Sequence, residues 1–480
     1  MGHAEQASFG EAAHGAAGEL AHFAASLAFD DIPADVLSRA KLLILDALGV
    51  GLASNAYPFA SVVLAGARAL GGDGPCTVIG RSDRLPLRDA AMVNGALIHG
   101  LDFDDTHLAS IVHPTAACLP CILSLGESLN VSGKALLTAY AAGMETAIRI
   151  GAAVRGGFHH VGFHATGIVA HFSSAVAASK LLGLDAGTIR AAQGIAASTA
   201  AGVQVFLEEG AWTKRFHPGW AAVAGITTAR LAESGFLSPS RPYEGRFGLF
   251  DTHLQDAAQE VDIDAMTARL GQDWTMAVTA MKPYPVCHFI HGCADAAIEL
   301  HAELDAEEIV EVEAFLPRET LPIVAEPAEA KENVHSDYEA KFSAQFVIAT
   351  CLLRGRFGLP ELQPEALGDP AIAALARKVR CFADPQTAFP EYFSGGVRLR
   401  TRSGRQLRRH VRVNSGAGPR ALGVDGTTQK FLSSASLTIP HDQALRIRDV
   451  VLDLESAAAA DLMAVLGTVV GGARSSQQEK

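Results

Sequence analysis

Positive charge is scarce in this sequence. The 480 residues include 39 lysines and arginines against 52 aspartates and glutamates, which gives a formal net charge of −13 at pH 7. A protein that binds nucleic acid needs a basic face for the phosphate backbone, so this balance argues against a nucleic-acid partner. It does not exclude a small anionic ligand, because a few cationic side chains can form a local basic pocket in an acidic protein.

Long uninterrupted apolar runs are also missing. The stretch LLTAYAAGMETAIRIGAAV (136–154), for example, is broken by Glu145 and Arg149 before it reaches membrane-spanning length. The N-terminal MGHAEQASFGEAAHG lacks the basic start and apolar core of a signal peptide. We therefore expect a cytoplasmic protein with no membrane partner.

Cysteine is too sparse for a disulfide framework, with seven in the whole chain. Cys118 and Cys121 form a lone CxxC with neither a preceding strand nor a second pair, so we expect two thiols in an apolar helix. The phosphate-binding patterns GxxxxGK[ST] and GxGxxG, the zinc motif HExxH, the EF-hand spacing and the GxSxG elbow are all absent. The sequence thus predicts no cofactor and no bound metal.

Helical periodicity dominates the first 271 residues. It is clear in DIPADVLSRAKLLILDALGVGLA (31–53) and GIVAHFSSAVAASKLLGL (167–184), and we expect no strand before about residue 300. The many alanines and glycines predict helices that pack close together. Later the pattern becomes mixed: EEIVEVEAFLP (307–317) alternates like a strand, and GGVRLRTRSGRQLRRHVRVN (395–414) is typical of a hairpin that turns at Ser403 and Gly404. Helical segments such as DPAIAALARKV (369–379) lie between them.

The length and composition fit a globular protein of two or three domains, with 49% hydrophobic and 19% charged residues. We predict a mainly α fold in which a large all-helical domain is interrupted by a smaller α+β domain. Residues 1–271 would form the first part of the helical domain and residues 272–415 the α+β insert. Residues 416–480 would return to the helical domain.

Three aspartates and two histidines lie close together in LDFDDTHLASIVHPTAA (101–117), in an otherwise apolar region. If the preceding helix continued through it, His99, Asp102 and Thr106 would share one face. His113 precedes Pro114, which suits the first turn of the next helix. His113 would then stand at a helix N-terminus, where free N–H groups favour an anion.

The same pattern recurs in three later segments. His164 begins a helix in GFHATG, Lys214 precedes Pro218 in TKRFHPG, and Lys282 comes before two prolines in KPYPVCHFIHG. The last segment also places Cys287 and His291 on the opening turns of a helix. Four segments that each bring a histidine or lysine to a helix start favour a shared negatively charged ligand. Carboxylates fit better than phosphates, since no glycine-rich phosphate loop is present.

Proton transfer beside a carboxylate is the chemistry that uses these residues most economically. Histidine can act as the base near neutral pH, because its unperturbed pKa is about 6.5. Lysines and helix N-termini would hold the carboxylates and the charge that develops. Asp102 would orient a histidine or take part directly.

Two other classes of protein stay open at this point. A metal-dependent hydrolase or hydratase could use the aspartates with His99, His107 or His113, because divalent metal sites combine these residue types. A non-catalytic carboxylate-binding protein would keep the basic helix starts and show binding without turnover. Metal analysis separates the first class from proton-transfer enzymes, and a turnover assay separates the second.

The ordered motifs DFDDT…HP, G-x-H-x-T-G and TK-x-x-H-x-G resemble those of the MmgE/PrpD family, and the similarity extends over nearly the whole chain. The resemblance implies a helical domain interrupted by an α+β lid, a homodimer, and a cofactor-independent lyase or isomerase that acts on a small di- or tricarboxylate. A hydro-lyase of the 2-methylcitrate dehydratase type is the first expectation. An iminodisuccinate-type epimerase and a cis-aconitate-type decarboxylase are the alternatives.

The resemblance also assigns roles to residues of this chain. His113 and His164 would be the acid–base pair, and Asp102 and Thr106 would orient them or the substrate. Carboxylate binding would fall to four residues: Lys214, Lys282, His291 and Cys287. Two departures count against decarboxylation: the stretch from Thr106 to His113 is one residue longer than in the animal decarboxylases, and Phe346 stands where they have a tyrosine.

Overall fold

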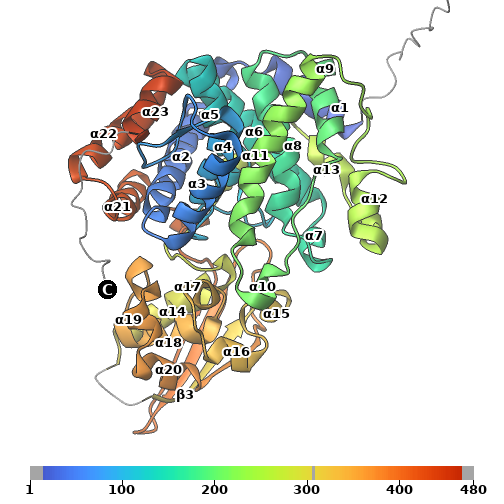
Figure 1. Cartoon of the computed structure of the whole chain (residues 1–480). Coiled ribbons are helices and arrows are strands. Elements are labelled where there is room, and N and C mark those ends of the chain that lie inside the picture. The colour runs from blue at the N-terminus through green and yellow to red at the C-terminus, as the bar shows by residue number, and fades with distance from the viewer. Residues whose placement is uncertain (1–14, 305–308, 468–480) are drawn as a thin grey trace, which may run out of the picture.

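The computed structural model describes residues 15–304 and 309–467, so the predicted absence of a signal peptide concerns residues that lie mostly outside it. A large helical part carries a smaller α+β part along one side (Figure 1). The prediction of a mainly α fold with an α+β insert is confirmed. Within the described residues, no helix is both long and apolar enough to cross a bilayer.

The helical part is built from the first half of the chain. Its helices are α1 (Ala16–Ser26), α2 (Ala34–Ser54), α3 (Pro58–Gly71), α4 (Leu87–Ile98), α5 (Pro114–Leu129), α6 (Gly133–Ala153), α7 (Gly157–His160), α8 (Ala165–Leu181), α9 (Ala186–Ala196), α10 (Phe206–Glu209), α11 (Thr213–Glu233), α12 (Leu249–Leu254) and α13 (Ile263–Thr267). Two short strands, β1 (Cys76–Thr77) and β2 (Arg84–Leu85), pair antiparallel. The expectation of no strand before residue 300 was therefore wrong, since two-residue strands are too short to produce an alternating pattern.

Glycines bring the central helices together. A Cβ added at Gly95 of α4 would lie 2.5 Å from the Cα of Gly219 of α11, so the two helices cross with their backbones in contact. A Cβ at Gly225 of α11 would lie 2.3 Å from the side chain of Ser174 of α8. These close crossings are what the small residues predict, and they hold the N-terminal ends of α8 and α11 near the C-terminal end of α4.

A four-stranded sheet forms the centre of the α+β part. Its strands are β3 (Ile309–Leu316), β4 (Val379–Ala383), β5 (Gly395–Thr401) and β6 (Gln406–Val411), in the order β4-β3-β5-β6. β3 and β4 are parallel, with Val312 opposite Val379, and the other pairs are antiparallel. The predicted hairpin is β5–β6, whereas β4 begins at Val379, the last residue of a segment that was expected to be helical. That helix ends at Ala376, and Val379 begins the strand.

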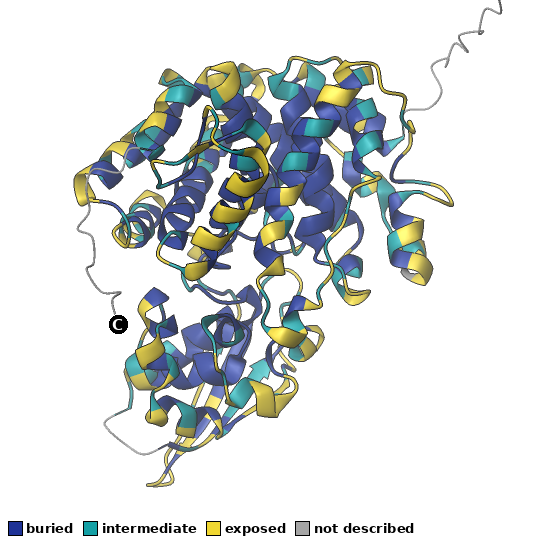
Figure 2. Cartoon of the chain, viewed as in Figure 1, coloured by how far each residue is buried: buried dark blue, intermediate teal, exposed yellow. Residues whose placement is uncertain are grey.

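One face of this sheet carries exposed charged side chains such as Arg398 and Arg400, and helices cover the other. They are α14 (His291–His301), α15 (Leu321–Val324), α16 (Ala328–Glu332), α17 (Asp337–Lys341), α18 (Ala344–Arg354), α19 (Pro364–Leu367) and α20 (Pro370–Ala376). Figure 2 shows that buried residues gather inside each part and that exposed residues lie on the outer faces. Each part therefore has its own hydrophobic core.

The last helices lie against the first ones. α21 (Val424–Ala435), α22 (His441–Leu452) and α23 (Ala459–Gly467) stand beside α2 in Figure 1 and share its hydrophobic core. Buried Lys430 of α21 forms an ion pair of 2.7 Å with Asp46 of α2 and donates to the carbonyl of Phe103 at 2.8 Å. The exact residue limits of the three predicted segments stay a prediction.

Candidate active site

The polar segment 99–113 is a loop and not a continuation of α4. The helix ends at Ile98, and Asp102 adopts a left-handed φ of +52°. The predicted helical stripe of His99, Asp102 and Thr106 was therefore wrong. The loop instead turns back on itself and brings these side chains toward the same place. Thr106 fixes the loop through two backbone hydrogen bonds with Ala280, at 2.8 and 2.9 Å.

A cavity of about 60 Å³ lies where this loop meets the α+β part. Since one water molecule needs some 10–15 Å³ by this measure, the cavity holds several non-hydrogen atoms. The lining residues are Asp102, Thr106, Ile111, His113, His159, His164, Gln204, Phe206, Leu207, Lys214, Lys282, Cys287, His288, Phe289, Ile323, Phe342 and Phe393. Seven of the eight residues predicted for the site are among them.

Asp102 is the charged centre of the cavity. Nζ of Lys214 donates to its Oδ1 at 2.9 Å, and Nζ of Lys282 donates to the same oxygen at 2.8 Å. Lys282 also donates to the backbone carbonyl of Asp102 at 2.8 Å. Burial alone would raise the pKa of Asp102, but the two ammonium groups hold it well below its usual range. The carboxylate therefore stays ionised and keeps both lysines in place.

His113 caps the N-terminus of α5, as predicted, and its hydrogen bonds fix its tautomer. Its Nδ1 lies 2.7 Å from the backbone carbonyl of Asp105, which can only accept, so Nδ1 carries the proton. In the neutral ring Nε2 is then unprotonated, and it lies 3.8 Å from Oδ1 of Asp102. Burial holds the pKa of His113 well below its ordinary value, although Asp104 opposes this. The ring is thus a neutral base at physiological pH.

His164 stands at the N-terminus of α8, also as predicted. Its Nδ1 lies 3.0 Å from Nδ1 of His217, so one of these two atoms donates to the other. Burial, together with the nearby His217, lowers the pKa of His164 well below its ordinary value. Nε2 of His164 is buried and has no hydrogen-bond partner. When His217 donates, this Nε2 carries a proton and can donate a hydrogen bond to a ligand.

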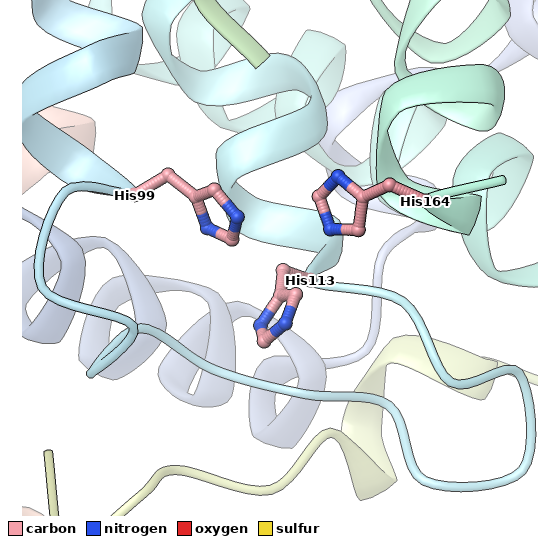
Figure 3. Close-up of side chains that lie close together, drawn as sticks. All are labelled: His99, His113 and His164. Atoms are coloured by element: carbon pink, nitrogen blue, oxygen red, sulfur yellow. The ribbon is translucent and has the colours of Figure 1, made fainter. Parts of the chain in front are cut away.

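A third histidine completes the group. Figure 3 shows His99, His113 and His164 with their rings facing one another. The ring of His99 stacks on that of His164 with centroids 5.4 Å apart, and its Nδ1 lies 2.8 Å from Oδ2 of Asp104. Burial alone would raise the pKa of Asp104, but His99 and His113 hold it below its usual range. His99 and Asp104 were not predicted as site residues, although DFDD and the preceding histidine were visible in the sequence.

The remaining predicted residues divide into two groups. Thr106 and Cys287 line the cavity, with the hydroxyl of Thr106 at 3.4 Å from Nδ1 of His113. His291 does not reach it: its Nε2 lies 3.3 Å from the carbonyl of Val286, and its ring packs behind His288 at 4.3 Å. His288 lines the cavity in its place. The sequence could not separate the two, because both lie at the start of the same helix.

Phe346 also lies outside the lining. It is buried in the core of the α+β part, where its ring meets Phe357 edge-on at 6.3 Å. The same segment reaches the cavity through Phe342, whose ring lies 5.0 Å from Nζ of Lys214. The missing tyrosine hydroxyl at position 346 therefore does not leave a gap in this lining.

Among the residues that the structure describes, two groups of side chains have their donor atoms within 4.8 Å of one another, as metal ligands would. They are His99, His113 and His164, and Asp102, Asp104 and His113. In the second group Asp102 already accepts from two ammonium groups, which would repel a divalent cation. In the first group Asp104 and a backbone carbonyl hold Nδ1 of His99 and His113, an arrangement that also occurs behind zinc-bound histidines. This trio keeps the metal-dependent alternative open to a direct test.

Two family models cover most of the chain. The model of the MmgE/PrpD N-terminal domain matches residues 18–262, and that of the MmgE/PrpD C-terminal domain matches residues 284–456. The chain belongs to the MmgE/PrpD family. The resemblance inferred from the motifs is thereby confirmed.

Curated relatives within the MmgE/PrpD family carry the names of two lyase activities. The cis-aconitate decarboxylase-like protein oryM of Aspergillus oryzae is 28% identical over 94% of this chain and 97% of its own length. Human cis-aconitate decarboxylase is 28% identical over 88% of each chain. The 2-methylcitrate dehydratase of Salmonella typhimurium is 25% identical over 86% of this chain and 89% of its own. These comparisons support an enzyme of the MmgE/PrpD type with a lyase activity, and no particular member.

Proposed function

We propose that the protein is a cofactor-independent lyase that moves a proton at the carbon beside a carboxylate of a small di- or tricarboxylic acid. The observation that carries this proposal is the free Nε2 of His113. A backbone carbonyl holds the proton on Nδ1 of that ring, and Nε2 lies in a cavity with two lysines. A neutral imidazole beside cationic groups is the arrangement that proton abstraction from a carbon acid requires.

In the proposed reaction, Lys214 and Lys282 bind carboxylate oxygens. His113 takes the proton from the neighbouring carbon, and the C–H electrons pass toward the carboxylate, whose growing charge the lysines stabilise. A C=C bond then forms as the C–O bond of a neighbouring hydroxyl breaks. The carboxylates of the bound substrate favour a second proton on His164, and this imidazolium gives a proton to the leaving oxygen, so that water departs. Asp102 keeps the lysines in position, and the hydroxyl of Thr106 supports the ring of His113.

Dehydration is our first choice because it uses both histidines in one turnover, one as base and one as acid. Decarboxylation is the second candidate, since four relatives at 28–31% identity carry the name cis-aconitate decarboxylase. It would release CO₂ and need only one histidine, to protonate the carbon. Epimerisation would return the proton to the opposite face of the same carbon.

Proton NMR in D₂O tests the proposal. The protein would be incubated with 2-methylcitrate, citrate, cis-aconitate, malate, the alkyl-substituted 3-isobutylmalate and iminodisuccinate. We expect one acid to lose the signal of the proton beside a carboxylate, with an alkene product for dehydration or released CO₂ for decarboxylation. His113→Gln and Lys214→Met should abolish this loss, while the exposed His160→Gln should not. Folded protein that leaves every acid unchanged would refute the proposal.

The two rival classes give different results in the same preparations. Metal analysis of protein purified without added metal would show one ion per chain for a metal-dependent hydrolase or hydratase. A chelator would then remove both the ion and the activity. A non-catalytic carboxylate-binding protein would bind one of these acids tightly and leave its C–H signals intact.

We also propose that the chain forms a homodimer, and the cytoplasmic location stays a prediction. Three aromatic side chains follow one another at helical spacing along α11: Trp212, Phe216 and Trp220, which are 40–45% exposed. Globular monomers rarely present aligned aromatics to solvent. Light scattering should give twice the chain mass, and Trp220→Glu should halve it while Leu437→Glu, at another exposed apolar position, should not. A monomeric wild-type protein at micromolar concentration would contradict the proposal.

A further inference from the structure

The cavity offers little positive charge for a ligand. Lys214 and Lys282 are the only lysines or arginines among its lining residues, and both already bind Asp102. Two ammonium groups and one ionised carboxylate leave a single net positive charge. His113 and His164 add none while they are neutral. A third carboxylate of a tricarboxylic acid would therefore be buried without a cationic partner, which is costly.

Much of the remaining lining is apolar. Phe289, Ile323, Phe342 and Phe393 come from the α+β part, and Phe206 and Leu207 come from α10. Phe289 and Phe393 pack edge-on with ring centroids 4.9 Å apart, which closes this side of the cavity. Burying a hydrocarbon group against such a surface is favourable, whereas burying a carboxylate there is not.

Four of these residues also border a second, wider hollow. Phe206, Leu207, Ile323 and Phe342 line both the cavity and a hollow of about 840 Å³. This hollow lies between α10 and the helices α15 and α16, at the boundary of the two parts (Figure 1). The four side chains thus form the partition between the lysines and a space large enough for several further carbons.

The charges around the hollow also disfavour a carboxylate there. Its lining includes Glu208, Glu326, Glu329 and Glu339 but only one lysine, Lys331, whose Nζ is bound to the backbone carbonyl of Ile323 at 2.9 Å. A carboxylate that passed the partition would meet mainly negative side chains. An uncharged hydrocarbon group would not be repelled.

We infer that the substrate carries an apolar arm of three or more carbons, which lies between Phe206, Leu207, Ile323 and Phe342. Its carboxylates, two at most, bind at Lys214 and Lys282. The ligand class is therefore an alkyl-substituted dicarboxylic acid and not a tricarboxylic acid. This inference rests on the proposed function for the location of the reacting carbon.

Unreactive ligands of matched shape test the inference by calorimetric titration. Tricarballylate and 2-isobutylsuccinate differ in that an isopropyl group replaces one carboxylate. We expect the alkyl compound to bind at least about tenfold more tightly, because apolar groups in apolar pockets discriminate by factors of this size. In the series 2-methyl-, 2-ethyl- and 2-propylsuccinate, each CH₂ should tighten binding by up to about fourfold. Tighter binding of tricarballylate, or equal affinity along the series, would overturn the inference.

A variant of the partition tests the position of the arm. Ile323→Arg places a cation there, and we expect it to reduce the preference for 2-isobutylsuccinate over tricarballylate at least tenfold. Leu353→Arg, at an exposed position of α18, is the matched control and should leave the preference unchanged. If Ile323→Arg does not fold, Ile323→Ala should lower the affinity for the longer alkylsuccinates alone. An unchanged preference in the folded variant would show that the arm lies elsewhere.

Different results would refute the proposed lyase activity and the inferred ligand class. These ligands have no hydroxyl to lose, so their binding does not depend on turnover. If alkylsuccinates bind with the expected preference but no acid loses a C–H signal, the proposed lyase activity is wrong and the ligand class stands. If a tricarboxylate is turned over and alkylsuccinates do not bind, the ligand class is wrong and the lyase activity stands.

Discussion

Replacing Asp102 by asparagine should destabilise the protein strongly at neutral pH. The substitution keeps the shape of the side chain but removes the charge that faces two buried ammonium groups at 2.8 and 2.9 Å. Each contact is worth about 6 kcal/mol of attraction at an effective dielectric constant of 20, most of which is offset by the cost of burying the charges. We expect a net loss of about 3–5 kcal/mol in the free energy of unfolding, as is usual when one partner of a buried ion pair is removed.

The direction in which the stability of Asp102→Asn changes with pH follows from the same argument. In the variant, repulsion should lower the pKa of one lysine in the folded state below the value of about 10.4 that it has in the unfolded chain. The unfolded state then binds more protons between these two values, so the stability of the variant should rise as the pH increases toward 10. Urea titrations at pH 7, 8.5 and 10 measure this.

A second substitution supplies the control. The double variant Asp102→Asn/Lys214→Met removes one of the two unpaired cations and should be more stable than Asp102→Asn alone. Asp30→Asn, at an exposed position, should change the stability by no more than about 0.5 kcal/mol. If Asp102→Asn is as stable as the wild-type protein at pH 7, and its stability rises with pH no more steeply than that of the wild-type protein, the carboxylate does not hold the lysines as argued.

Three further predictions follow from the same site. Because burial keeps the pKa of His113 well below 6.5, the loss of kcat/KM on acidification should occur below pH 6.5. A loss that already occurs at pH 7 or above would contradict a buried neutral base. Asp104→Asn weakens the hydrogen bond that orients His99, so kcat should fall about tenfold with KM little changed. A tenfold rise of KM would instead indicate that Asp104 has a role in substrate binding. Lys341 is fully buried, donates to the carbonyl of Leu101 at 2.7 Å, and has a pKa lowered by burial to about 7. The unfolded chain therefore binds more protons than the folded chain between pH 7 and about 10.4, so the stability of the wild-type protein should rise over that range. In urea titrations, Lys341→Met should make this rise smaller. An unchanged slope would mean that other groups cause the rise.

The sequence predicted which residues form this site better than it predicted how they are arranged. His113 and His164 could be placed at helix N-termini because a proline or a small residue followed each of them, and these local rules depend on few neighbours. The path of the loop after Ile98 could not be predicted, because it depends on the positive φ of Asp102 and on hydrogen bonds to Ala280. A helical continuation was the wrong expectation for that reason.

Contacts between segments that are distant in the sequence could not be predicted either. Lys282 and Asp102 are 180 positions apart, and only the packing of the two parts of the molecule brings them together. The choice between His288 and His291 depends on which side of one short helix faces the cavity, and both histidines satisfied the pattern. The apolar partition was not predicted at all, since Phe206 and Ile323 lie in segments with no polar motif to draw attention to them.

The ion pair between Lys430 and Asp46 makes the site depend on the end of the chain. Lys430 also holds the carbonyl of Phe103, next to Asp102, from a helix near the end of the described residues. During synthesis the loop of Asp102 is made early, but this anchor follows more than 300 residues later. A nascent chain without α21 leaves the carboxylate of Asp46 without its ammonium partner and the loop without this support. The loop of Asp102 therefore lacks this anchor until α21 has been made and has packed against α2.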